Sequence, residues 1–253
     1  MRLLEVVGLT KRFAGLTALD AVSFTAEEGL ILGLFGPNGA GKTTCLHCLS
    51  GFITPDSGRI IFDGREITGQ APHRLAQSGI ARTFQIARPF RNLTAAENVV
   101  VALGHRRSPL LGAGLGAWRG GATRRRALAL LERVGLGADA DRPAGQLPLG
   151  SLKRLEVARA LALGPRLVLL DEPLGGLAHE EVPVVCELIA SLRAEGLTIV
   201  LVEHQMGVPL ALADRAVVLD HGALIASGAP ERVRRDPRVI EAYLGEDAAR
   251  LGR

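Results

Sequence analysis

Aromatic side chains are scarce in this 253-residue chain, which has one Trp, one Tyr and seven Phe. Proteins that bind single-stranded nucleic acids stack the bases on aromatic rings, so we expect no such platform here. Long apolar runs are also missing, because charged residues interrupt each run well before the roughly 18 residues that a membrane-spanning helix needs. The first seven residues are too short for a signal peptide and include Glu5. These absences predict a cytosolic protein.

Lysine is rare as well. Lys11, Lys42 and Lys153 are the only lysines, and arginine supplies the rest of a net charge of +4. A basic excess can indicate a nucleic acid or an anionic membrane surface as partner. The basic residues cluster densely only at 124–126, with a smaller pair at 106–107. Because aromatic residues are few, we expect no nucleic-acid partner.

Cysteine occurs three times, at Cys45, Cys48 and Cys186. The spacing of Cys45 and Cys48, with His47 between them, allows a redox or metal motif. The same spacing places both thiols on one face of a helix, where small buried side chains belong. We interpret this pair as core packing, and a cytosolic protein needs no disulfide.

Strand and helix patterns alternate along most of the chain, and 47% of its residues are hydrophobic. This pattern predicts an α/β fold with a largely parallel sheet and helices on both faces. A helical lobe of about 86–163 interrupts it, so the α/β core consists of 1–85 and 164–253. Within the lobe, Thr94 and Glu97 form a capping box, and residues 104–121 indicate a loop. We expect strands at 3–7, 18–25, 30–35, 59–62, 80–84, 166–170, 197–202 and 216–220, and helices at 44–49, 98–103, 127–134, 151–163 and 180–194.

A phosphate-binding loop follows the apolar strand 30–35 and precedes a helix. Its glycines let the backbone wrap the phosphates, and the helix N-terminus favours an anion. Lys42 is expected to reach the β- and γ-phosphates, and the Thr43 hydroxyl is expected to bind Mg²⁺. The expected nucleotide-binding residues here are Gly36, Pro37, Asn38, Gly39, Ala40, Gly41, Lys42, Thr43 and Thr44.

Polar residues end three other apolar strands. Asp171 and Glu172 follow strand 166–170, Gln85 follows strand 80–84, and His204 comes after strand 197–202. Ligands of open α/β sheets bind beyond the carboxyl ends of the strands, so these residues are expected around one γ-phosphate. Asp171 is interpreted as orienting Mg²⁺ and Glu172 as polarising the attacking water. Phosphoryl transfer needs mainly positioning and charge stabilisation, which this set supplies.

Taken in order, these motifs resemble the ATPases of the ATP-binding-cassette (ABC) family over nearly the whole chain. Finer segments resemble one branch, the ATP-binding subunits of branched-chain amino-acid importers. These segments are residues 79–85, 88–94, 154–161 and 236–245. The resemblance implies a single domain, 1–253. Its fold would be a RecA-like P-loop NTPase core with an N-terminal antiparallel β subdomain and an inserted α-helical subdomain.

The resemblance also implies roles and partners. Phe13 matches the aromatic residue that stacks on adenine. Gln85 matches a Mg²⁺ ligand that transmits the nucleotide state, and His204 matches the histidine that bonds the γ-phosphate. A second ATPase subunit, two transmembrane permease subunits and, indirectly, a solute-binding protein are the implied partners. The segment that matches the signature closing over ATP on the opposite subunit is Leu147, Pro148, Leu149, Gly150 and Ser151.

This signature segment departs from the general family pattern. Pro148 replaces a serine, which removes a hydroxyl and a backbone N–H, and Leu149 replaces a glycine. Leu152 replaces a glutamine of the branch, and Ala178 stands where the loop after Glu172 normally ends in aspartate. We expect the ATP site that this segment closes to hydrolyse poorly, which favours a heterodimer of ATPases.

The sequence leaves several alternatives for the function open. The cargo is expected to be branched-chain amino acids, with urea, another amide or another amino acid as alternatives. A lipid or polysaccharide exporter would carry a similar cassette. A soluble cassette acting on ribosomes or DNA is a further alternative. The expected location is the cytoplasmic face of the inner membrane, with residues 104–126 as an insertion on the side of the permease.

Overall fold

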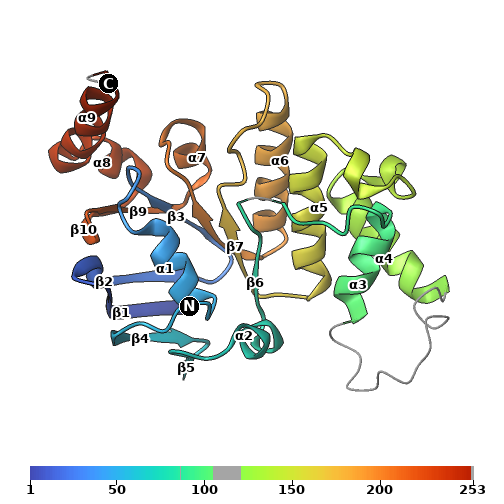
Figure 1. The fold of residues 1–253 in the computed structure, drawn as a ribbon, viewed down its shortest axis with the longest axis horizontal. Helices are drawn as coiled ribbons and strands as arrows, with labels where there is room; N and C mark the ends of the chain where they lie inside the picture. Colours follow the sequence, from blue (N-terminus) through green and yellow to red (C-terminus); the bar gives the residue numbers. More distant parts are fainter. Residues whose placement is uncertain (86, 105–120, 252–253) are drawn as a thin grey trace.

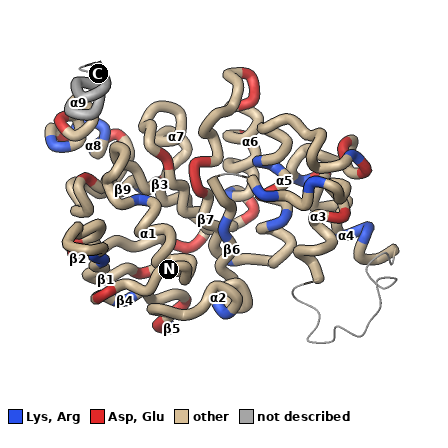
Figure 2. The backbone as a smooth tube through the Cα atoms, viewed as in Figure 1, with Lys and Arg blue, Asp and Glu red and all other residues tan. Residues whose placement is uncertain are grey.

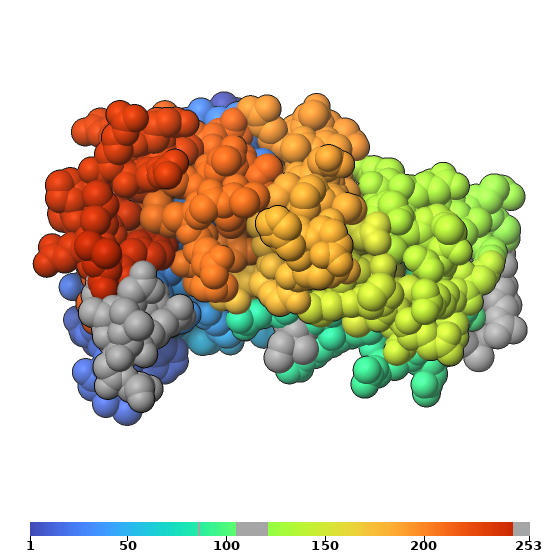
Figure 3. Space-filling model, turned by 90° about the horizontal axis from the view of Figure 1, so that it is seen from above, coloured from blue at the N-terminus to red at the C-terminus, as the bar shows by residue number. Residues whose placement is uncertain are grey.

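The computed structural model describes residues 1–85, 87–104 and 121–251. The molecule is elongated, with an α/β core at one end and a helical lobe at the other (Figures 1 and 3). The predicted loop at 104–121 lies almost entirely outside the described residues. No helix in the described part of the chain is long and apolar enough to cross a membrane.

The N-terminal part forms an antiparallel sheet in the order β2-β1-β4-β5. The long hairpin of its first two strands extends the predicted strands 3–7 and 18–25 at both ends. The strands are β1 (Arg2–Phe13), β2 (Leu16–Glu27), β4 (Ser57–Phe62) and β5 (Arg65–Glu66).

A second sheet has the order β10-β9-β3-β8-β7-β6, and all neighbours are parallel except β9 and β10. Every residue of β3, β7 and β8 is buried, as expected for parallel strands with helices on both faces. The predicted parallel sheet is therefore confirmed. Its strands are β3 (Ile31–Phe35), β6 (Ile80–Arg82), β7 (Leu167–Asp171), β8 (Thr198–Val202), β9 (Arg215–Asp220) and β10 (Ala223–Gly228).

Alternate residues of this sheet face two separate cores. Leu32 and Leu34 pack with helix α1 (Lys42–Leu49) beneath the antiparallel sheet. Ile31 and Phe35 pack on the other side, with helix α6 (Glu181–Ala194) and helix α7 (Gly207–Leu212). Helix α1, which directly follows the phosphate loop, therefore lies between the two sheets (Figure 1).

The helical lobe contains α3 (Ala95–Gly104), α4 (Gly121–Arg133) and α5 (Leu149–Ala162), with 3₁₀ turns at Gly137–Asp139 and Ala144–Gln146. The capping box is confirmed, because the Glu97 N–H donates to the Thr94 hydroxyl and the Glu97 carboxylate accepts from the Thr94 N–H. Helix α4 starts six residues before its predicted beginning at 127, because its polar first turns are exposed and carry no apolar periodicity.

Sequence patterns missed the long C-terminal helix and several short elements, and they misplaced the end of one strand. Strand β6 ends at Arg82 instead of residue 84, because the Asp171 N–H of its neighbour β7 donates to the Thr83 hydroxyl, not to the Thr83 carbonyl oxygen that would continue the ladder. The missed elements are β5, β10, α2 (Pro72–Ser78), α8 (Pro230–Arg234) and α9 (Pro237–Leu251).

Candidate active site

Four neighbouring parallel strands end at one edge of the sheet, in the order β6-β7-β8-β3. Gln85 follows β6, Asp171 ends β7 and Glu172 comes directly after it, His204 follows β8, and the phosphate loop follows β3. Because parallel strands share the position of their carboxyl ends, all four polar segments lie along this edge. Acidic residues lie near the middle of the molecule beside β7 (Figure 2).

The phosphate loop needs glycine at two positions. Gly36 has φ 148° and Gly41 has φ 100°, values that favour glycine. A Cβ atom at position 36 would lie 2.2 Å from the carbonyl oxygen of Leu219, and one at position 41 would lie 2.4 Å from that of Ala18. The loop is therefore pressed against strands β9 and β2, and its backbone is fixed.

Helix α1 begins at Lys42, directly after the N-cap Gly41. The Lys42 side chain is buried, and its Nζ donates to the carbonyl oxygens of Gly36 at 2.6 Å and Pro37 at 2.8 Å. Thr43 is exposed and Thr44 half-buried at the same helix N-terminus. A buried lysine, free helical N–H groups and an accessible hydroxyl suit a nucleotide phosphate and its metal ion.

Glu172 is the centre of the polar cluster. It has φ 45°, in the left-handed region that non-glycine residues adopt mainly at functional sites. Gln85 Nε2 donates to its Oε2 at 2.6 Å, and His204 Nδ1 lies 3.9 Å from the same oxygen. The structure thus brings together the three residues predicted to be catalytic.

Two residues that sequence reasoning missed hold the backbone of the loop that begins at Glu172. Lys153 Nζ, on α5, donates to the Glu172 carbonyl oxygen at 2.5 Å. Glu203 is buried, and its Oε1 accepts from the Leu174 N–H at 3.0 Å. Burial raises the pKa of Glu203 to about 7, opposed by that N–H and by Lys153, while burial lowers the pKa of Lys153. Both were visible in the sequence, one as a rare lysine and the other beside His204.

Asp171 is buried beside Glu172 and forms an ion pair that was not predicted. Arg82 Nη2 donates to its Oδ2 at 2.9 Å. The Asp171 N–H donates to the Thr83 hydroxyl at 3.3 Å. Oxygen ligands such as this carboxylate, the Thr43 hydroxyl and the Gln85 amide oxygen are those that Mg²⁺ prefers. No group of three or more His, Cys, Asp or Glu residues in the described ranges forms a metal site of its own, so the fit to Mg²⁺ depends on phosphate oxygens as well.

Phe13 and two of the cysteines lie in opposite surroundings. Phe13 is exposed at the end of β1, and the Lys11 ammonium group lies 5.4 Å from the centroid of its ring. Cys45 and Cys48 are buried free thiols, and burial raises the pKa of both, that of Cys48 to about 11. The interpretation of this pair as core packing agrees with that burial.

The signature segment forms the start of α5. Pro148 is the N-cap, and Leu149 is exposed while Leu147, Gly150 and Ser151 are buried. A Cβ atom at position 150 would lie 2.3 Å from a carboxylate oxygen of Glu181. The Glu181 carboxylate also accepts from the Ala178 N–H at 3.1 Å. The segment therefore packs against the loop that follows Glu172.

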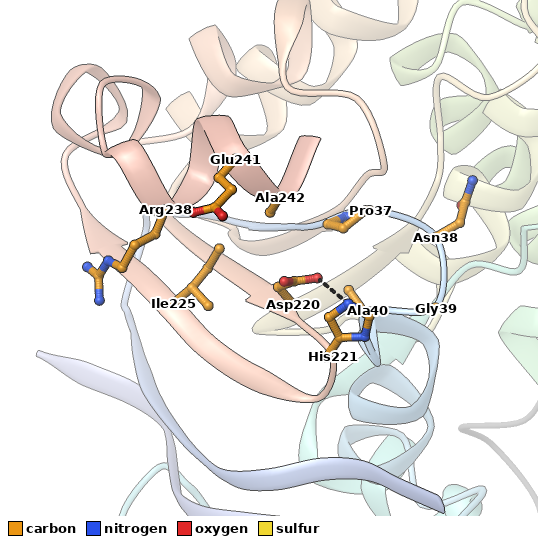
Figure 4. Close-up of a pocket in the computed structure, with 10 residues that line it drawn as sticks. All are labelled: Pro37, Asn38, Gly39, Ala40, Asp220, His221, Ile225, Arg238, Glu241 and Ala242. Atoms are coloured by element: carbon orange, nitrogen blue, oxygen red, sulfur yellow. Dashed lines mark ion pairs between the residues drawn. The ribbon is translucent and has the colours of Figure 1, made fainter. Parts of the chain in front are cut away.

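A cavity of about 710 Å³ lies on the outer side of the phosphate loop (Figure 4). Its walls come from the loop, from the turn after β9, from β10 and from helix α9. None of Gln85, Glu172 and His204 lines it, so it is separate from the polar cluster. The lining residues are Pro37, Asn38, Gly39, Ala40, Asp220, His221, Ile225, Arg238, Glu241 and Ala242.

Comparison with protein families gives two matches. Residues 19–175 match the family described as ABC transporter. Residues 223–249 match the family described as branched-chain amino acid ATP-binding cassette transporter.

Comparison with individual proteins gives matches over almost the full length. The chain is 44% identical to the high-affinity branched-chain amino acid transport ATP-binding protein BraF of Pseudomonas aeruginosa, over 96% of this chain and 98% of that protein. It is 41% identical to LivG of Escherichia coli K12, a protein with the same description, over 96% and 98%.

Comparison with solved structures gives ATP-binding cassettes with a similar fold. A nucleotide-free ATP-binding cassette from an ABC transporter superposes with a TM-score of 0.86 at 32% identity, covering 96% of this chain and 99% of that one. The ADP conformation of an ATP-binding cassette also has a TM-score of 0.86, at 31% identity, with 97% and 100% covered.

Proposed function

Because this chain belongs to the ATP-binding subunits of the ABC transporter family, we propose that it hydrolyses ATP to energise the import of branched-chain amino acids. The family membership carries the ATPase activity. The cargo rests on the names of the relatives BraF and LivG and on the match of residues 223–249. The fold agrees with this activity. The polar cluster and the phosphate loop follow the carboxyl ends of neighbouring strands, where a nucleotide phosphate would bind.

In this proposal the chain's own residues bind and orient the nucleotide. The phosphate loop and Lys42 hold the phosphates, and Phe13 stacks on adenine. Thr43, Asp171 and the Gln85 amide oxygen would hold Mg²⁺, which neutralises charge on the phosphate oxygens when bound. Lys42 has to exchange its contacts with the Gly36 and Pro37 carbonyl oxygens for phosphate oxygens. That exchange keeps its ammonium group hydrogen-bonded in both states.

Glu172 acts as the general base for the attacking water. Its carboxylate is held by Gln85, and its backbone is held by Lys153 and by the Val202 carbonyl oxygen, to which the Glu172 N–H donates at 2.9 Å. A fixed base within reach of a water is the main requirement for this role. His204 Nδ1 lies 3.9 Å from the same carboxylate, and its ring would donate to the γ-phosphate.

The transporter partners follow from the family, and an exposed aromatic surface supports their location. Phe52, Phe84 and Phe90 are 52%, 41% and 49% exposed, around the segment that contains Gln85. The rings of Phe52 and Phe84 meet edge to face with centroids 5.9 Å apart. Exposed rings of this kind are typical of protein interfaces. We assign this surface to the permease subunits, and place the protein at the cytoplasmic face of the inner membrane.

A second ATPase subunit completes each ATP site. The signature segment of this chain has Pro148 and Leu149 in place of serine and glycine, so the site that it closes loses a hydroxyl and a backbone N–H that could donate to the γ-phosphate. The site built on Lys42, Glu172 and His204 keeps its own groups and needs a signature from a partner. A heterodimer with one stronger site follows from this asymmetry.

The cluster of Gln85, Glu172 and His204 supports the roles proposed for these residues. The test of the proposed function is a transporter reconstituted in proteoliposomes from this chain, its permease subunits, a second ATPase subunit and a solute-binding protein. Leucine, isoleucine or valine should stimulate ATP hydrolysis, whereas urea should not. Stimulation by urea alone would mean that urea, and not a branched-chain amino acid, is the cargo.

Failure of the chain to hydrolyse ATP in a complete transporter would contradict the proposed ATPase activity. Stimulation by a lipid or polysaccharide would make it an exporter.

A further inference from the structure

Arg82 links the phosphate-loop helix to Asp171. It lies on β6, next to β7, and its side chain is 7% exposed. Nη2 donates to Asp171 Oδ2 at 2.9 Å and Nη1 donates to Ser50 Oγ at 2.9 Å. Ser50 is the C-cap of α1, and its hydroxyl donates to the Leu46 carbonyl oxygen at 2.6 Å. One guanidinium thus spans the end of α1 and the end of β7.

The guanidinium is also held by the surface rings. Its Cζ lies 5.5 Å from the ring centroid of Phe52 and 5.5 Å from that of Phe84. Its Nε is buried and has no hydrogen-bond partner in the described part of the chain. The position of Arg82 is therefore set by its two terminal nitrogens and by the two rings. A planar, permanently charged fork suits this geometry, whereas lysine offers one point charge.

Asp171 needs such a partner. Its side chain is 5% exposed, so its negative charge is largely removed from water. Arg82 compensates this charge and fixes one carboxylate oxygen, so that the group keeps one orientation relative to α1, whose first turn carries Lys42 and Thr43. Residues that hold a metal-binding carboxylate in place control the affinity of the site for metal.

We propose that Arg82 is a positioning residue of the Mg²⁺ site, which fixes the Asp171 carboxylate and couples it to the rings of Phe52 and Phe84. This inference rests on the proposed nucleotide site, because it assigns a supporting residue to that site. Arg82 touches neither nucleotide nor water in this role. Its effect passes through the orientation of Asp171.

The test measures metal binding and nucleotide binding separately in the full chain. Binding of Mn²⁺, a spectroscopic substitute for Mg²⁺, is followed by electron paramagnetic resonance with a non-hydrolysable ATP analogue at saturation. Binding of a fluorescent ATP analogue is followed in the presence of EDTA. The variants are Arg82→Met, Arg82→Lys and Ser50→Ala, with Asp171→Asn as the reference for a lost carboxylate.

Arg159→Met is the matched control. Arg159 also stacks on a phenylalanine, 5.6 Å from the Phe90 centroid, and also pairs with a carboxylate, that of Glu156, but it lies on α5 away from Asp171. We expect Arg82→Met to weaken Mn²⁺ binding by about 10- to 100-fold, as found for residues that support metal ligands. Binding of the nucleotide without metal should change by less than about twofold, and Arg159→Met should change neither.

Arg82→Lys should weaken Mn²⁺ binding less than Arg82→Met, because the charge remains while one of the two anchors is lost. If Arg82→Met does not fold, Ser50→Ala decides, since it removes one anchor and keeps the ion pair. It should then weaken Mn²⁺ binding severalfold. Unchanged Mn²⁺ affinity in the folded variants, beside a loss in Asp171→Asn, would overturn the inference alone. A wild-type chain that binds neither nucleotide nor Mn²⁺ would overturn the proposed function instead.

Discussion

The side-chain amide of Gln85 donates a hydrogen bond of 2.6 Å to the Glu172 carboxylate. The two residues are 87 positions apart in the sequence, and they meet because β6 and β7 are neighbours in the sheet. Gln85 directly follows the exposed ring of Phe84. A protein that moves this surface segment therefore also moves the residue that holds the proposed base.

Replacing Gln85 by Ala should uncouple hydrolysis from the permease. Without the amide, the Glu172 carboxylate loses its 2.6 Å partner and its fixed orientation. We expect cargo-stimulated ATP hydrolysis in the assembled transporter to fall by about 10- to 100-fold, since small misplacements of catalytic groups have effects of this size. Nucleotide affinity in EDTA should stay within about twofold of wild type. Full stimulation in the variant would show that the contact has no role in coupling.

Replacing Gly41 by Ala should disrupt the phosphate loop. The added Cβ would lie 2.4 Å from the Ala18 carbonyl oxygen, at φ 100°. Backbone strain of this kind costs about 1–3 kcal/mol, and the close approach adds to it. Gly64→Ala is the matched control, because Gly64 has φ 72° and no atom would lie within 4 Å of its added Cβ. Chemical denaturation should give a larger loss of unfolding free energy for Gly41→Ala, which should also lose ATP binding. Equal losses would contradict the tight fit of the loop.

The buried carboxyl of Glu203 should make stability depend on pH. Burial and the Glu172 charge raise its pKa to about 7, against the Leu174 N–H, Lys153 and the His204 N–H. In the unfolded chain a glutamate titrates near pH 4.3, so between about pH 4.3 and 7 the folded state binds more protons. The free energy of unfolding therefore falls as pH rises through this window and levels off above it.

Glu203→Gln removes this titration and keeps an acceptor for the Leu174 N–H. Relative to wild type, the variant should gain stability between about pH 4.5 and pH 8 by an amount on the order of 3 kcal/mol. Urea denaturation of both proteins at a series of pH values measures this difference. A difference that stays constant with pH would mean that Glu203 is ionised throughout.

Much of the site was predictable from the sequence, because its residues follow strands. Gln85, Asp171, Glu172 and the phosphate loop each come after an apolar strand, and parallel strands end at the same edge. The order of the strands was not predictable from local patterns. The pairing of Arg82 with Asp171 depends on that order, because the two residues are 89 positions apart and meet only across β6 and β7.

The support of Glu172 by α5 was missed for a related reason. The patterns predicted helix 151–163 correctly, yet nothing local indicates that Lys153 points to the loop after β7. Short or polar elements were missed because their periodicity is too brief to read. Helix α8, with five residues, and the polar start of α4 are examples.

The substitution Glu172→Gln separates ATP binding from ATP hydrolysis. It keeps the size of the side chain and removes the base, so ATP binding should remain within about twofold of wild type while hydrolysis in the reconstituted transporter falls by about 10²- to 10⁴-fold. Both quantities are measured on the same preparation, with phosphate release for hydrolysis and a fluorescent ATP analogue for binding. Hydrolysis at the wild-type rate, with binding intact, would contradict the assignment of Glu172 and with it the account of this site.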